Sequence, residues 1–484
     1  MPRHAPVRAL SLATSRYAAL PGWAPHETAW AVTLLAVLLL TAALLAGHGT
    51  AYGAQDRVNE CSPAVTIRAV DSTIAADDQR QTYAYPYRDP YLATITAAAL
   101  NPDGLTPGLK RQMVHVPVLP GRNDLPTLEG RGEVSVALYR QHRAAPLLFI
   151  LSGIGSNPYF GLGTYFANVF HREGFHVVVL PSPMHWNFAL AASPSGAPGY
   201  APDDARDLYD VMQRTLQILE GRHGVKVASV HFMGASLGAL EGAYLSVIDA
   251  EQKKIGIERF LLLNPPLDLP YAVERLDQWA ALQEKFGPEK SAALRGRALA
   301  IVDSFTRDKR DDPASVDRLA RKFACFTTEE LQFLIAEYVQ TTIPELVYVT
   351  QAIHDQQLLV SAKGSLSERL QEAKGFTLTD YTNKIAIPVW TRRAGLQSDS
   401  QSLRNGGSLA AILDRVRSNP KVFIMHNADD VLTSRGSVEE LKSAMGDHMI
   451  LYPVGGHLGN LWFQQNRDAI VAVVKSAAGS ESTR

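Results

Sequence analysis

Short apolar runs alternate with amphipathic stretches along most of the chain. Solid runs such as Pro146–Leu151 and Phe175–Leu180 are typical of strands buried on both faces. By contrast, Asp203–Glu220 repeats its apolar residues on one side of a helix whose start is marked by Pro202. Further strands are predicted at Gln112–Val118, Glu133–Arg140, Val225–Phe232, Ile257–Leu263, Lys421–His426 and His448–Tyr452, and further helices at Phe160–Arg172 and Leu461–Ala477. This alternation predicts an α/β fold with a doubly wound, mostly parallel sheet.

The alternation stops between about Pro270 and Ile385, where no convincing strand is found. Capping-box patterns begin at Thr327 and Ser365 and indicate helix starts. The predicted helices are Glu274–Phe286, Ser291–Arg307, Ala314–Phe323 and Glu329–Asp355. A helical insertion of this length is too long for an ordinary connection between strands. We therefore expect a helical cap over the strand ends.

Near the N-terminus, residues 28–47 carry no charge and consist almost entirely of Ala, Leu and Val. A run of this length can cross the hydrocarbon core of a membrane as a transmembrane helix. The positive residues before it are Arg3, Arg8 and Arg16, so the positive-inside rule places the N-terminus in the cytoplasm and the rest of the chain outside.

Two interpretations of this segment stay open, a cleaved signal peptide and an uncleaved membrane anchor. The small residues Ala51, Gly53 and Ala54 would suit a cleavage site. The run is longer than a usual signal-peptide core, and Tyr52 fits poorly at position −3 of a cut after Ala54, which slightly favours the anchor. Under either interpretation, the chain from about Gln55 onward is exported from the cytoplasm.

These patterns divide the chain into four parts. The export or anchor segment is 1–54, with its apolar run at 29–47, and an irregular N-terminal arm rich in Pro and Tyr follows at 55–110. The α/β core is predicted at 111–270 and 385–478, and the helical cap at 271–384.

Composition narrows the possible functions. The 484 residues include 47 Lys and Arg against 48 Asp and Glu, a balance that gives no electrostatic basis for binding nucleic acid. The hydrophobic fraction of 46% excludes a disordered chain. Cys61 and Cys325 are the only cysteines, so neither a disulfide scaffold nor a cysteine-based zinc module is possible, although the two could pair in an oxidising compartment.

The sequence Gly234-Ala235-Ser236-Leu237-Gly238 lies between a predicted strand and a small-residue helix. A Gly-x-Ser-x-Gly pattern in this context forms a tight turn that exposes the serine hydroxyl, and residues two before and two after the serine must lack bulk. Ser236 is therefore the candidate nucleophile. The alternative is a structural turn without chemistry.

A serine hydroxyl needs a base, and the base needs a partner that orients it. The candidate base is His457, on a glycine-rich loop between the last strand and the closing helix. Asp429 and Asp430 directly follow the strand at Lys421–His426. Spacing favours Asp430 as the third member, and Asp429 stays open as the alternative.

The order Ser236, Asp430, His457 resembles that of the α/β-hydrolase superfamily, and the resemblance covers about Gln112 to Ala477. Family members with such caps include esterases, lipases, thioesterases and serine aminopeptidases. The chain departs from the usual pattern at Ser152-Gly153, where His-Gly is common, and at Asn427, where Gly is common. The N-terminal arm has no obvious counterpart in the family.

The resemblance implies a mechanism through an acyl-enzyme on Ser236, without a metal or an organic cofactor. The oxyanion hole would include the backbone N–H of Leu237 and that of Ile154, with Gly155 as the next candidate. Trp186 and Phe188 could line an acyl pocket, and ordinary packing is an equally good interpretation.

Three functions are weighed. The leading one is an exported or membrane-anchored serine hydrolase of the esterase or lipase type, acting on a small or lipid-like acyl substrate. The second is a serine aminopeptidase that would hold a substrate amine with an acidic cap residue, for which the candidates are Glu274, Glu329, Glu330 and Glu337. The third is a non-catalytic envelope interaction protein. The sequence does not indicate an oligomeric state.

Overall fold

The computed structural model describes residues 83–100, 109–124, 131–308, 313–359, 366–394 and 405–478. The predicted segment 1–54, Cys61 and the capping box at Ser365 lie outside these residues. Within the described ranges, no helix has both the length and the apolar character needed to cross a membrane.

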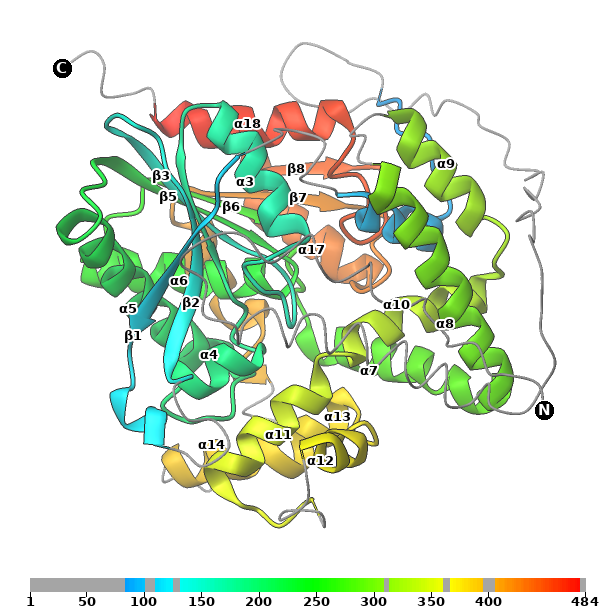
Figure 1. Ribbon diagram of the computed structural model, residues 1–484. Helices are drawn as coiled ribbons and strands as arrows, with labels where there is room; N and C mark the ends of the chain where they lie inside the picture. Colours follow the sequence, from blue (N-terminus) through cyan, green and yellow to red (C-terminus); the bar gives the residue numbers. More distant parts are fainter. Residues whose placement is uncertain are drawn as a thin grey trace, which may run out of the picture. The chain divides into compact units, whose positions relative to one another are not determined.

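One eight-stranded sheet forms the centre, in the order β1-β2-β4-β3-β5-β6-β7-β8. Its strands are β1 Gln112–Pro117, β2 Glu133–Tyr139, β3 Ala145–Leu151, β4 His176–Leu180, β5 Val227–Ala235, β6 Arg259–Leu263, β7 Val422–Asn427 and β8 Met449–Tyr452. β2 pairs antiparallel with both β1 and β4, and all the other pairs are parallel. The mostly parallel sheet predicted from the sequence is confirmed (Figure 1).

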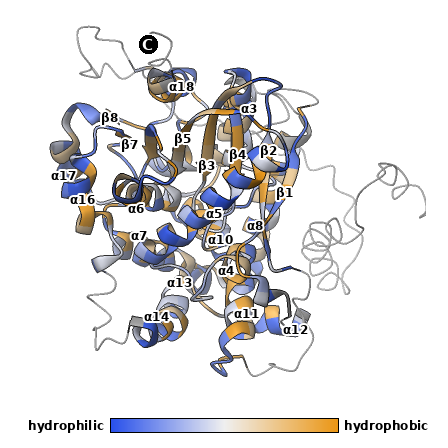
Figure 2. Cartoon of the chain, turned by 90° about the vertical axis from the view of Figure 1, so that its left-hand side faces the viewer, coloured by the Kyte–Doolittle hydropathy of each residue, from blue (hydrophilic) through white to orange (hydrophobic). Residues whose placement is uncertain are grey.

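Helices cover both faces of this sheet. Those nearest the strands are α3 Leu162–Arg172, α4 Trp186–Ala191, α5 Ala201–Gly221, α6 Leu237–Gln252, α16 Leu413–Arg417, α17 Arg435–Met445 and α18 Gln464–Ala478. Alternate residues of β3 point to opposite faces: Phe149 joins a core cluster with α5 and α6, and Ile150 joins one with α3 and α18. Figure 2 shows the hydrophobic strands inside and the hydrophilic side of α5 outside.

The described residues between β6 and β7 are mostly helical. It contains α7 Leu269–Ala280, α8 Leu282–Asp308, α9 Pro313–Phe323, α10 Thr328–Gln340, α11 Ile343–His354, α12 Leu366–Ala373, α13 Leu378–Asp380 and α14 Ile387–Ala394. The predicted capping box at Thr327 is present at the start of α10. A six-residue π-helical stretch, η4 Tyr381–Ala386, joins α13 to α14, so the helical run continues through the expected cap boundary at residue 384.

The single helix predicted at Glu329–Asp355 is wrong, because the structure divides it into α10 and α11. Pro344 lies in the first turn of α11. Proline lacks the N–H of a helix interior and is tolerated in the first turn, so it marks a helix start. The resulting turn brings Thr342 against the loop after β3, which matters for the site below.

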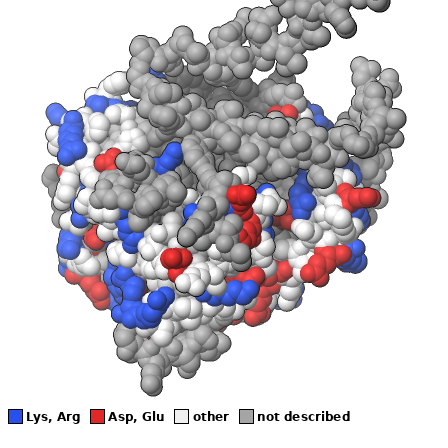
Figure 3. All heavy atoms as spheres, turned by 60° about the horizontal axis from the view of Figure 1, so that its bottom comes forward, with Lys and Arg blue, Asp and Glu red and all other residues white. Residues whose placement is uncertain are grey.

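The described part of the N-terminal arm contains α2 Pro90–Ile95 and a short 3₁₀ turn, η1 Thr96–Ala99. Before α2 the described chain has no regular secondary structure, and its alternate residues Tyr83, Tyr85 and Tyr87 are all buried. The described part of the arm therefore packs on the body of the molecule. Over the described part of the face drawn in Figure 3, acidic and basic residues are interspersed, in keeping with the balanced composition.

Candidate active site

Ser236 occupies the turn between β5 and α6, with φ 56° and ψ −123°. Left-handed backbone at a non-glycine residue is strained and is typical of functional turns. The turn closes so tightly that a Cβ on Gly234 would lie 2.1 Å from the Gly238 carbonyl oxygen, and one on Gly238 would lie 2.4 Å from that of Leu151. Glycine is therefore needed at both positions, as the motif predicts.

The structure brings His457 to Ser236. The imidazole Nε2 lies 2.8 Å from Ser236 Oγ, and Nδ1 lies 3.0 and 3.1 Å from the two oxygens of Asp430. An ionised carboxylate can only accept, so Nδ1 carries the proton and donates to Asp430. Nε2 is then unprotonated and accepts from the Ser236 hydroxyl, which is the arrangement that a general base requires.

The Asp430 side chain is completely buried. Burial raises its pKa, but the interactions with His457 and His426 and the hydrogen bonds to its oxygens outweigh burial, so the pKa of Asp430 lies below its usual value. Asn264 Nδ2 donates to Oδ2 at 2.7 Å, and the Leu432 N–H donates to Oδ1 at 2.9 Å. Asp430 is therefore an ionised, pre-oriented acceptor.

Asp429, the alternative from the sequence, has another contact. Its Oδ1 accepts a 2.9 Å hydrogen bond from the Gly456 N–H, beside His457 in the chain. Burial raises the pKa of Asp429 to about 6, against the effect of backbone hydrogen bonds from Gly456 and Gly455. In this geometry Asp430 contacts the imidazole and Asp429 contacts the loop that carries it.

The loop after β3 lies beside Ser236, as the oxyanion-hole expectation requires. A Cβ on Gly153 would be 3.2 Å from Ser236 Cβ. Leu237 is the first residue of α6, a position whose N–H has no partner within the helix. Gly155 has φ +64°, and its added Cβ would be 2.0 Å from Thr342 Cγ2, so the turn between α10 and α11 covers this part of the loop. Ile154, the preferred second donor, lies between these two glycines.

The two aromatic candidates for an acyl pocket differ in burial. Phe188 is completely buried in the core cluster that contains α5 and α6, which agrees with the packing interpretation. Trp186 is partly exposed, and the Arg131 guanidinium lies 6.0 Å from the centre of its ring.

Three of the four acidic cap residues considered for binding an amine are already paired. Glu329 binds Lys285 at 2.6 Å, Glu330 binds Lys290 at 2.9 Å, and Glu337 forms an ion pair with Arg295. The fourth, Glu274, is exposed on α7. A carboxyl that the sequence did not single out is Glu345, one turn after Thr342, whose pKa burial raises to about 7.

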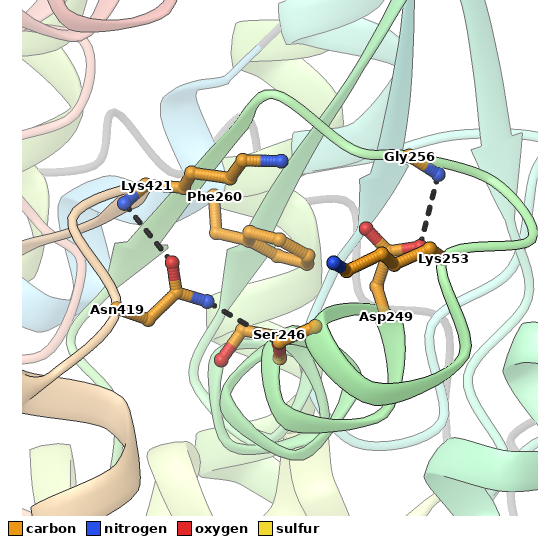
Figure 4. A pocket seen from close by; sticks show the side chains of 8 residues that line it. Ser246, Asp249, Lys253, Gly256, Phe260, Asn419 and Lys421 are labelled. Carbon is orange, nitrogen blue, oxygen red and sulfur yellow. Dashed lines mark hydrogen bonds between the residues drawn. The ribbon is translucent and has the colours of Figure 1, made fainter.

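A separate cavity of about 360 Å³ lies at the opposite end of α6 from Ser236 (Figure 4). Its polar groups bind one another: Asp249 accepts from the backbone N–H groups of Gly256 and Ile257, and Asn419 Nδ2 donates to the Ser246 carbonyl. None of the residues that line this cavity belongs to the site at Ser236.

Two site residues were missed by sequence reasoning. Asn264 directly follows β6, and its position at a strand end was the only available signal. Thr94 accepts a 2.9 Å hydrogen bond from the His457 N–H, and nothing in the local sequence of the arm indicated this.

No family model matches the chain, and no protein with a curated function matches it. Among solved structures, it is similar to the alpha/beta hydrolase GrgF from Penicillium sp. sh18, with 14% identity over 76% of this chain and 99% of that chain and a TM-score of 0.40. An esterase from Pyrococcus furiosus gives 12% identity, 77% and 94% coverage and a TM-score of 0.38. Proline iminopeptidase from Mycobacterium smegmatis shares 13% identity over 76% of this chain and 100% of that chain, with a TM-score of 0.35. Similarity at this level gives no information on substrate.

The fold and the local geometry agree on where chemistry would occur. Ser236 stands at the carboxyl end of a central parallel strand, where ligands of open α/β sheets bind. The eight-stranded, mostly parallel sheet, with helices on both faces and a serine at the turn from β5 to α6, fits the α/β-hydrolase fold that the sequence resembles.

Proposed function

We propose that the protein is a serine hydrolase that cleaves a carboxylic ester or a lipid-like acyl substrate through an acyl-enzyme on Ser236. The observation that carries the proposal is the hydrogen-bonded chain from Ser236 Oγ through His457 to Asp430, with successive distances of 2.8 and 3.0 Å. A serine becomes nucleophilic when an oriented base can take its proton.

In the proposed reaction His457 Nε2 takes the Ser236 proton as Oγ attacks the acyl carbon. The oxyanion of the tetrahedral intermediate is stabilised by the backbone N–H groups of Leu237 and Ile154. The imidazolium gives its proton to the departing alcohol, which leaves the acyl group on Ser236. Water then attacks this ester, His457 takes a proton from the water, and the acid is released as Ser236 regains its proton.

An amphiphilic substrate is favoured by two exposed aromatic residues that lie close in the chain to the loop after β3. Tyr159 and Phe160 directly follow the loop after β3 and are 37% and 64% exposed. Exposed aromatic side chains that follow such a loop in the chain suit an apolar acyl chain. We further propose that the protein is exported, either membrane-anchored or released by cleavage, because of the apolar run at 29–47. A reporter fused after Arg57 should then be active only outside the cytoplasm.

The direct test is labelling with a fluorophosphonate probe, which reacts with an activated serine. Wild type should be labelled and Ser236→Ala should not be labelled. A folded wild type without Ser236-dependent labelling would overturn the proposal and favour the non-catalytic interpretation. A series of p-nitrophenyl esters of rising acyl length would then define the acyl preference.

A second candidate, release of N-terminal residues from peptides, is favoured by one observation. Glu345 is a partly buried cap carboxyl near Thr342, which itself contacts Gly155. If Glu345 bound a substrate amine, Glu345→Gln would reduce hydrolysis of aminoacyl amides and leave p-nitrophenyl esters unaffected. The ester proposal predicts that aminoacyl amides are poor substrates of wild type as well.

A further inference from the structure

The described part of the N-terminal arm, Tyr83–Leu100, lies against the loop that carries His457. This histidine loop, Pro453–Phe463, joins β8 to α18. In Figure 1 the arm is the blue segment beside the orange and red chain near β7 and β8. The two segments are far apart in sequence, since Thr94 and its partner His457 are separated by 363 positions.

Thr94 contacts the backbone of His457 itself. Its Oγ1 accepts a 2.9 Å hydrogen bond from the His457 N–H and donates a 2.6 Å hydrogen bond to the Pro90 carbonyl. The single hydroxyl proton is therefore directed into α2, which leaves the oxygen lone pair facing the histidine loop. The Asp89 side chain accepts from the first two backbone N–H groups of α2 and fixes the start of that helix.

Two glycines of the histidine loop are needed because the arm is so close. A Cβ on Gly456 would lie 2.2 Å from the Pro90 carbonyl oxygen, and one on Gly459 would lie 1.9 Å from that of Ala93. Gly456 also has φ +58°, which glycine adopts without strain. The absence of a side chain at these two glycines therefore allows the backbones of the loop and the arm to lie in close contact.

The arm is fixed to the same loop by buried side chains. The Tyr85 hydroxyl donates to the Gly459 carbonyl at 3.1 Å, and Trp462 Nε1 donates to Thr96 Oγ1 at 3.1 Å. Tyr83 accepts from Asn460 Nδ2 at 2.9 Å, and its ring lies 5.0 Å from that of Tyr452 on β8. Buried hydrogen bonds of this kind are expensive to break, so the arm and the loop form one rigid unit.

The loop is also bound to the last residue of β7 and to a residue just after that strand. The Gly456 N–H donates to Asp429, and the Gly456 carbonyl accepts from Asn427 Nδ2 at 2.7 Å. Without the arm, this glycine-rich loop would lose part of its support. A shift of about 1 Å in a catalytic group can reduce rate by roughly a hundredfold, so support from both sets of contacts bears directly on the 2.8 Å contact between His457 and Ser236.

We propose that the N-terminal arm is part of the active site and that Thr94 is a positioning residue for His457. This inference rests on the proposed function, since it concerns the same site. The arm has no counterpart in the family pattern that the sequence resembles, and a chain starting at residue 111, where the core is predicted to begin, would lack it.

The test compares Thr94→Val, which keeps the shape but cannot accept the hydrogen bond, with Thr94→Ser, which can. With a p-nitrophenyl ester, Thr94→Val should lower kcat at least tenfold and leave KM within about twofold, because the base is displaced and substrate contacts are not. Thr94→Ser should restore most of kcat. A residue that only stabilised the fold would alter the unfolding midpoint and leave kcat of the folded fraction unchanged.

Thr215→Val is the matched control. The Thr215 hydroxyl also donates to the carbonyl four residues earlier, that of Val211 at 2.7 Å, but it lies within α5, away from the histidine loop. The kcat of Thr215→Val should equal that of wild type. If Thr94→Val does not fold, Thr94→Ala takes its place against the same serine variant.

The fluorophosphonate labelling rate separates the two proposals. Ser236-dependent labelling of wild type, with a Thr94→Val rate equal to that of wild type, would overturn the role of Thr94 and leave the serine hydrolase intact. A wild type without Ser236-dependent labelling would overturn both. Slow labelling of Thr94→Val with a normal rate for Thr94→Ser is the expected result.

Discussion

Asn264 donates a 2.7 Å hydrogen bond from Nδ2 to Oδ2 of Asp430. The two residues follow the neighbouring strands β6 and β7 and are 166 positions apart in the chain. Asn264 adopts φ 48°, a conformation that asparagine tolerates better than most residues. The carboxylate that orients His457 is thus itself oriented from the adjacent strand.

We therefore expect Asn264→Ala to lower kcat about ten- to hundredfold, because a hydrogen bond to a charged group contributes roughly 1.5–3 kcal/mol. Asn264→Asp should be worse, since it places a second carboxylate against Asp430. Steady-state kinetics with a p-nitrophenyl ester measures both. Wild-type kcat in folded Asn264→Ala would show that Asp430 does not depend on this contact.

Mutation of Asp429 and of Asp430 should have clearly different effects on kcat. Asp430→Asn should lower kcat by about 10³–10⁴, because an amide cannot hold the imidazole in the tautomer that Asp430 imposes. Asp429→Asn should cost far less, since an amide oxygen can still accept from the Gly456 N–H. A larger loss for Asp429→Asn would move the assignment by one residue.

Asp429 should also influence how stability depends on pH. Its pKa is raised in the folded state, from 3.8 to about 6, so between these values the folded protein binds more protons than the unfolded chain. The contribution of this group to stability is therefore present at low pH and is lost as pH rises through about 6. An asparagine at this position does not titrate, so Asp429→Asn should not lose this stability as pH rises.

Urea midpoints of wild type and Asp429→Asn at pH 5 and pH 8 measure the effect. The variant should gain stability relative to wild type at pH 8 and gain less at pH 5. The same difference at both pH values would contradict the raised pKa.

The glycines around Ser236 should not tolerate a side chain. Gly234→Ala would place Cβ 2.1 Å from a backbone oxygen, a contact that requires the turn itself to move. We expect loss of activity and a destabilisation of about 3 kcal/mol or more. Gly296→Ala on α8, where the added Cβ meets nothing within 4 Å, should instead be neutral or stabilising by about 0.5–1 kcal/mol. Thermal unfolding compares the two, and equal effects would contradict the steric argument.

Local sequence was enough to predict the strands and the turn at Ser236, because buried parallel strands and tight turns leave patterns within a few residues. It was not enough for Asn264 or Thr94, whose partners lie 166 and 363 positions away in the chain. The choice between Asp429 and Asp430 stayed open for a related reason. Adjacent residues of a loop point in different directions, and only the packed neighbours decide which of them meets the imidazole.

If Ser236 is the nucleophile, it carries the acyl group during turnover. The most direct measurement is acid quenching of the protein during the first turnovers of a p-nitrophenyl ester, followed by peptide mass analysis. We predict an added acyl mass on the peptide that contains Ser236 in wild type and none in Ser236→Ala, which should also lose hydrolysis. Hydrolysis that persists in Ser236→Ala, with no acylated peptide in wild type, would show that Ser236 is not the nucleophile.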